Sequence, residues 1–165
     1  MDFSFFTPGE VKGSAALLSY IFETYVENMY YLFGEDLKDE KSQQAWIRSN
    51  LENPDKEFYW RLILAHNGGE NAGFLIYTIQ SNVFYVNDIQ IGKKFRYCPA
   101  VLKGLFCNAF TKEKDAFEQI AGYINDKNIA SKNNFLRCAD KTEKTERGIR
   151  LYISKDSLFK RFRIR

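Results

Sequence analysis

The stretch Val83–Asn108, VFYVNDIQIGKKFRYCPAVLKGLFCN, decides the expected fold. Its first part predicts a strand, with one face carrying Val83, Tyr85, Asn87, Ile89 and Ile91. Its second part predicts a helix that begins at Pro99 and repeats apolar residues at Val101, Leu102, Leu105, Phe106 and Phe110. The basic connection Gly92–Cys98 lies between them. Because the first amides of a helix are unpaired and its dipole favours negative charge, this joint could bind an anion. The alternative is an ordinary strand-loop-helix joint with solvated lysines.

Size and composition indicate a single domain over residues 1–165. Apolar residues make up 45% of the chain and charged residues 27%, which is typical of soluble globular proteins. The net charge of +3 is too small to favour nucleic acid as the main partner. No apolar run is long enough to cross a bilayer. Three cysteines without C-x-x-C spacing, and a single histidine, favour the cytoplasm and predict no metal site.

Hydrophobic periodicity and turn residues predict a mixed α/β chain in the order β-α-α-β-β-β-α-β-α-β-β. Strands are expected at 3–6, 57–65, 72–80, 83–91, 117–124, 149–154 and 158–164, and helices at 11–33, 38–53, 99–110 and 129–137. His66-Asn67-Gly68-Gly69 predicts a hairpin turn, because glycine supplies the positive φ that such turns require. The charged run 140–147 is a solvated loop or the exposed arm of a hairpin, with the loop favoured.

This element order resembles that of the Gcn5-related N-acetyltransferase (GNAT) superfamily. Ala72-Gly73-Phe74 matches the family's apolar-glycine step after a hairpin turn. Ile91 matches the end of the family's cofactor strand, and Arg96–Val101 matches its Q/R-x-x-G-x-G/A loop. Ile124, Asn128, Ser131 and Phe135 follow a second family spacing. The resemblance implies a mixed sheet whose central strands splay apart, with helices on both faces.

The sequence departs from the family pattern at three places, one of which is Ala139-Asp140, where the family often has Gly-Phe at the entry to its penultimate strand. Pro99 and Val101 stand where the loop usually has small residues that let backbone amides approach the pyrophosphate of coenzyme A. Phe135 stands where many members have a tyrosine that protonates the leaving thiolate, and phenylalanine cannot do this.

The resemblance implies direct attack of a substrate amine on acetyl-coenzyme A, with Asp88 as the first candidate for the base. An exposed strand charge or a hydrogen-bond anchor is an equally good interpretation of Asp88. Alternation places Asn87 and Asp88 on opposite faces of the strand. Glu35 and Asp36 are expected near a cationic acceptor. The residues expected to bind the cofactor are Ile89, Gln90, Ile91, Arg96, Tyr97, Cys98, Ala100, Val101, Leu102, Asn128 and Phe135. For Asn128, a helix N-cap is the more common role.

Two functions from different classes remain open. The first is an N-acetyltransferase that uses acetyl-coenzyme A and a small-molecule or protein amine, without membrane association. The second is a degenerate, non-catalytic binding protein with the GNAT fold, favoured by Pro99, Val101 and Phe135. A homodimer is possible in either case. The single histidine, His66, receives no role because its hairpin turn is expected to lie away from the site.

Overall fold

A computed structural model describes residues 1–34, 45, 49, 51 and 60–163. Within these residues, seven strands form one mixed sheet in the order β1-β2-β3-β4-β5-β7-β6. The strands are β1 (Asp2–Phe6), β2 (Arg61–Asn67), β3 (Glu70–Gln80), β4 (Val83–Ile91), β5 (Gln119–Asn125), β6 (Lys141–Lys144) and β7 (Gly148–Ser154). The helices are α1 (Pro8–Lys12), α2 (Ala15–Phe33), α4 (Pro99–Lys112), α5 (Ile129–Phe135) and α6 (Lys155–Phe162), with short 3-10 turns η2 (Lys93–Phe95) and η3 (Leu136–Cys138).

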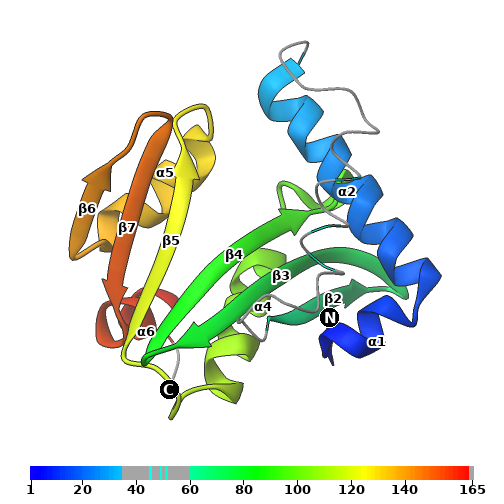
Figure 1. Ribbon diagram of the computed structural model, residues 1–165, viewed down its shortest axis with the longest axis horizontal. Helices are drawn as coiled ribbons and strands as arrows, with labels where there is room; N and C mark the ends of the chain where they lie inside the picture. Colours follow the sequence, from blue (N-terminus) through cyan, green and yellow to red (C-terminus); the bar gives the residue numbers. More distant parts are fainter. Residues whose placement is uncertain (35–44, 46–48, 50, 52–59, 164–165) are drawn as a thin grey trace.

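Helices cover both faces of the sheet, as the sequence predicts (Figure 1). One face packs against α4, α5 and α6 through a core rich in phenylalanine, in which the Phe84 ring stacks on Tyr77 at 4.5 Å. The other face packs against α1 and α2 through Val11, Leu17, Ile21 and Phe22. Among the described residues no helix is long and apolar enough to cross a membrane.

The central strands part, as predicted. β4 and β5 pair in parallel only from Val83–Val86 with Gln119–Gly122, and all other neighbouring strands are antiparallel. Beyond these pairs β4 continues to Ile91 and β5 to Asn125, and the two strands diverge (Figure 1).

The predicted stripe on β4 is wrong because the strand contains a bulge. Ile76 of β3 pairs with Asp88, and its neighbour Tyr77 pairs with Val86, so Asn87 is an extra residue in β4. The alternation of side chains between the two faces therefore shifts by one residue at the bulge. The face toward α4 carries Phe84, Val86, Ile89 and Ile91.

The C-terminal segment predicted as a strand is helix α6 instead. Ser154 caps it by accepting a hydrogen bond from the Ser157 amide (3.3 Å). Leu158, Phe159 and Phe162 then lie on the helix face that packs into the core. Basic residues in the last turn match the helix dipole, so the alternation of apolar and basic residues belongs to a helix.

The remaining differences are smaller. The predicted helix 11–33 is two helices, separated at Gly13-Ser14, where Ser14 caps α2 by accepting from the Leu17 amide. The run 140–147 contains β6, which pairs with β7, so the hairpin alternative is the right one. Gly68 and Gly69 have φ of 62° and 82°, as the hairpin turn requires. The helix expected at 38–53 lies almost wholly outside the described residues.

Candidate functional site

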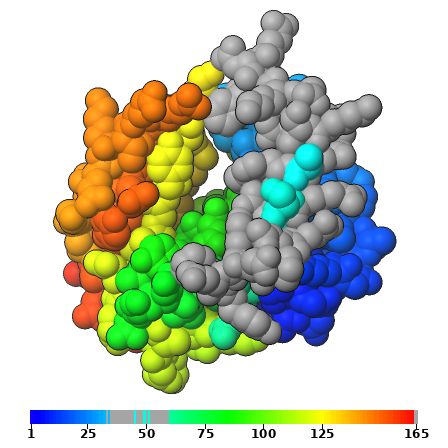
Figure 2. All heavy atoms as spheres, in the orientation of Figure 1, coloured from blue at the N-terminus to red at the C-terminus, as the bar shows by residue number. Residues whose placement is uncertain are grey.

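The parting of β4 and β5 leaves an opening in the sheet next to the central strand. Figure 2 shows the molecular surface hollowed between the residues of β5 and the chain of α2. On its β5 side, the end of β4 has no strand partner among the described residues beyond Val86. Backbone groups at such an edge must bond to water or to a ligand, so this edge can accept an extended chain as an added strand.

The bulge places two polar side chains of β4 on the face toward α2. The Thr78 hydroxyl donates to Asn87 Oδ1 (3.2 Å), and Thr78 lies on the same face of β3 as Phe74 and Ile76. Asp88 pairs with Ile76 and shares that face. The prediction that Asn87 and Asp88 point to opposite faces is therefore wrong, because simple alternation does not hold across a bulge.

Asp88 is a partly buried carboxylate that accepts a hydrogen bond from a neighbouring side chain. Gln90 Nε2 donates to Asp88 Oδ1 at 2.8 Å. Burial raises the Asp88 pKa to about 6, although hydrogen bonds from Gln90 and the Ile89 backbone lower it. Tyr25 of α2 lies on the same side, and burial together with the Asp88 charge raises its pKa to about 12. Asp88 is thus ionised at neutral pH, with a pKa close enough to that pH for proton transfer.

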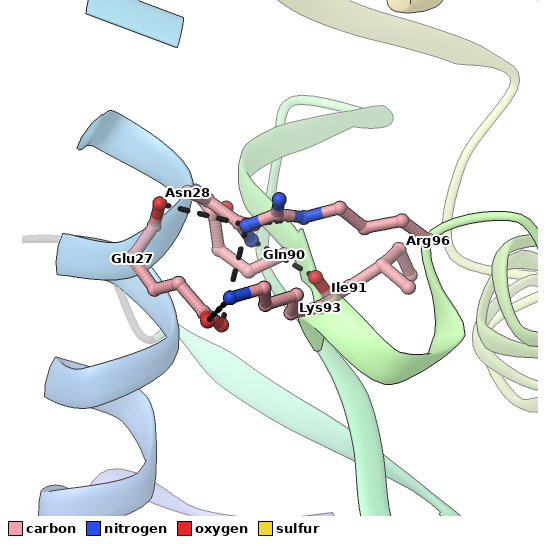
Figure 3. A network of polar contacts seen from close by, with 6 residues as sticks. All are labelled: Glu27, Asn28, Gln90, Ile91, Lys93 and Arg96. Carbon is pink, nitrogen blue, oxygen red and sulfur yellow. Dashed lines mark hydrogen bonds and ion pairs between the residues drawn. The ribbon is translucent and has the colours of Figure 1, made fainter. Parts of the chain in front are cut away.

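Arg96 does not extend along the connection toward the start of α4. Its guanidinium turns to α2, where Nε and Nη2 both donate to Asn28 Oδ1, at 3.0 and 2.7 Å (Figure 3). It also lies over the Tyr31 ring, 4.4 Å from the centroid. Asn28 in turn donates through Nδ2 to Gln90 Oε1 (2.8 Å) and to the Ile91 carbonyl (3.0 Å). Sequence reasoning missed Asn28, since no motif marks one asparagine in an amphipathic helix.

The connection to α4 keeps free amides where an anion could approach. Pro99 has no N–H, and the Val101 amide donates to the Cys98 carbonyl (3.1 Å). Within the described part of the chain, the amides of Tyr97 and Ala100 have no acceptor. The Tyr97 side chain is 88% exposed, whereas that of Val101 is fully buried in the core. The Val101 branch therefore points away from these amides.

The lysines of the connection are held by acids on neighbouring elements. Lys94 Nζ bonds both carboxylate oxygens of Glu70, at 2.8 and 2.5 Å, and Lys93 lies 3.8 Å from Glu27. The Glu70 contact shows that the β2–β3 hairpin adjoins the connection, contrary to the expectation that this hairpin lies away from the site. The His66 ring nevertheless contacts Ser4 of β1, with Nε2 and Oγ 3.0 Å apart.

The other predicted cofactor residues divide into backbone and core positions. Ile89, Ile91, Cys98 and Leu102 are partly buried and pack their side chains against the α4 core, which leaves their backbones to meet a ligand. Phe135 packs edge-on against Phe106, with centroids 5.5 Å apart. Asn128 caps α5, its Oδ1 accepting from the Ser131 amide (3.0 Å). Glu35 and Asp36 lie outside the described residues.

The close approach of the β4 backbone explains why residue 73 of β3, opposite the end of β4, is a glycine. A Cβ at this position would lie 2.7 Å from the Gln90 carbonyl oxygen and 3.2 Å from Ile91 Cα. Both atoms belong to backbone and cannot yield easily. The absent side chain therefore lets β3 approach β4 closely where β4 borders the opening.

No protein-family model matches the sequence, and no curated protein matches it. Solved structures do match in shape. The PaiA N-acetyltransferase from Thermoplasma acidophilum, crystallised in complex with coenzyme A, aligns with a TM-score of 0.69 at 12% identity, over 93% of this chain and 99% of that one. An acetyltransferase of the GNAT family from Staphylococcus aureus gives 0.66 at 13% identity, with the same coverages.

The ribosomal-protein-S18-alanine N-acetyltransferase from Escherichia coli gives a TM-score of 0.57 at 9% identity, over 93% of this chain and 94% of that one. At these identities, the matches establish similarity of fold alone. The chain therefore has the fold of the GNAT acetyltransferases.

Proposed function

We propose that this protein is an N-acetyltransferase that moves an acetyl group from acetyl-coenzyme A to a primary amine by direct attack. The observation that carries the proposal is the parting of β4 from β5 beside Asp88, a carboxylate on the face toward α2. A structure of similar shape is crystallised with coenzyme A, which supports the same choice of acyl donor.

The chain offers two sets of backbone groups to the donor. The edge of β4 from Ile89 to Ile91 would pair with the pantetheine arm as an added strand, with a backbone amide near Ile91 polarising the thioester carbonyl. The free amides of Tyr97 and Ala100, at the start of α4, would meet the pyrophosphate. Both sets act through backbone, so Pro99 and Val101 do not abolish the site.

The chemistry assigned to Asp88 is proton removal from the attacking amine. The amine attacks in its neutral form: its nitrogen forms a bond to the thioester carbon as Asp88 takes one of its protons, and the carbon–sulfur bond then breaks. Phe135 has no proton to give, so the thiolate takes one from water and Asp88 returns its proton to solvent. Catalysis would come mainly from holding the two reactants in line. Glu35 and Asp36 remain proposed contacts of the cationic acceptor.

Calorimetric titration with coenzyme A and acetyl-coenzyme A tests the donor, and thiol release in the presence of a panel of small amines and N-terminal peptides tests transfer. The proposal predicts binding of both donors and amine-dependent release of free thiol. Absence of donor binding would overturn it. Binding without thiol release for any amine would instead favour the degenerate binding protein, which the core position of Phe135 supports.

A further inference from the structure

A continuous line of side-chain hydrogen bonds joins the connection after β4 to Asp88. It runs from Arg96 to Asn28, from Asn28 to Gln90, and from Gln90 to Asp88, with donor–acceptor distances between 2.7 and 3.0 Å. Figure 3 shows its first three members, where α2, β4 and the connection meet. Asn28 and Gln90 are only 8% and 6% exposed. A buried side-chain amide that lacks a hydrogen-bond partner costs free energy. The pairing of two nearly buried amides in one line therefore implies that the line has a definite role.

The orientation of the Asn28 amide is fixed at both ends. Arginine can only donate, so the atom of Asn28 that meets Nε and Nη2 of Arg96 must be oxygen. The Ile91 carbonyl can only accept, so the atom that meets it must be nitrogen. The two constraints are independent and agree.

The fixed Asn28 amide then orients Gln90. Asn28 Nδ2 donates to Gln90 Oε1 at 2.8 Å, which turns the Gln90 nitrogen toward Asp88. With the opposite orientation, Gln90 would present a carbonyl oxygen to the Asp88 carboxylate, and the two would repel. Arg96 therefore sets the direction of donation along the line, because its guanidinium can only donate hydrogen bonds.

We propose that Arg96, Asn28 and Gln90 are positioning residues for Asp88, and that Arg96 acts by orienting the two amides rather than by its charge. The assignment of Asp88 as the base rests on the proposed function, whereas the orientation does not. The sequence assigned Arg96 and Gln90 to the cofactor and had no role for Asn28. The structure assigns all three to one line that ends at the carboxylate.

The charges around Arg96 support an orienting role. Glu27 Oε2 lies 4.0 Å from Arg96 Nη2, and Glu27 Oε1 lies 3.8 Å from Lys93 Nζ. Arg96, at the outer end of the line, thus faces the Glu27 carboxylate, and Lys93 lies near the same carboxylate. Among the described residues, Tyr25 of α2 is a titratable group whose pKa is raised by burial and by the Asp88 charge, and its neutral phenol adds no charge at physiological pH.

The experiment is a carbon-detected NMR titration of the Asp88 carboxyl in the substrate-free protein, assigned by its loss in Asp88→Asn. Gln90→Met removes the direct donor with little change in volume and is expected to raise the Asp88 pKa by about one pH unit. Arg96→Met frees the amides to rotate and is expected to raise it by a smaller amount. Arg96→Lys retains the charge with one donor group, and is expected to restore part of the difference.

Lys93→Gln is the matched control, because it removes a positive charge from the same connection without touching the line. We expect Lys93→Gln to leave the Asp88 titration unchanged. Equal shifts in Lys93→Gln and Arg96→Met would overturn the orienting role in favour of a charge effect, and no shift in Gln90→Met or Arg96→Met would overturn the line itself. If Gln90→Met does not fold, Arg96→Met still decides. Shifted titration without any change in acetyl transfer would leave the line intact and remove Asp88 as the base.

Discussion

The two faces of β4 carry opposite kinds of side chain within one short strand. Toward α4 the strand presents Phe84, Val86, Ile89 and Ile91, which pack into the phenylalanine core. Toward α2 it presents Asp88 and Gln90, which bond to each other and to Asn28. The bulge at Asn87 lets both sets exist, because it returns the apolar residues after it to the core face. One face holds the strand in place, and the other carries groups that can do chemistry.

The largest effect is expected on the apolar face. Phe84→Ala removes a fully buried ring that stacks on Tyr77 and contacts Phe110 and Phe117 at 5.0 and 5.3 Å. The free energy of unfolding, measured in urea, should fall by about 3–5 kcal/mol. Tyr85→Ala, on the opposite face and 38% exposed, should change it by less than about 1 kcal/mol. Similar losses of unfolding free energy in the two variants would show that the two faces of β4 contribute equally to stability.

On the polar face, removing the charge should stabilise the protein. The Asp88 pKa is raised in the folded state to about 6, so this group stabilises the fold at low pH and loses that contribution as pH rises through about 6. Asp88→Asn keeps the acceptor for Gln90 but cannot ionise. Its stability relative to the parent should therefore increase by about 2–3 kcal/mol between pH 4 and pH 7. Urea unfolding at the two pH values measures this, and a constant difference would contradict it.

A smaller effect is expected where β3 supports β4 from the side. Gly73→Ala would press a methyl group against the Gln90 carbonyl oxygen and should lower the free energy of unfolding by about 1–3 kcal/mol. Gly9→Ala is the control, since a Cβ there meets nothing within 4 Å. Equal urea midpoints for the parent and Gly73→Ala would show that the two strands can separate without loss.

The sequence was sufficient for most of the fold because periodicity and turn residues are local signals. The strand at 83–91, the helix from Pro99 and the Gly68-Gly69 turn are all present. Long-range properties were harder. The bulge depends on how β4 pairs with β3, so alternation within β4 alone gave the wrong stripe. Residues 158–162 fit both periods, and the cap at Ser154 together with packing on the core selected a helix.

The candidate site was predicted only in part. Asp88 stands out by its position on the central strand, and the structure gives it a buried setting and a raised pKa. The direction of Arg96 could not be predicted, because its partner Asn28 is 68 residues earlier in the chain. The same holds for Gln90, whose side chain donates to Asp88.

The most direct test of the central claim is the pH dependence of kcat/KM for acetyl transfer, compared between the parent and Asp88→Asn with the same amine. The ratio of the two values cancels the ionisation of the amine itself. We expect the parent to be about 10²–10⁴-fold faster at pH 8, with the ratio falling as pH drops below about 6. His66→Ala should follow the parent at every pH. A ratio near one throughout, or the same loss in His66→Ala, would contradict the account.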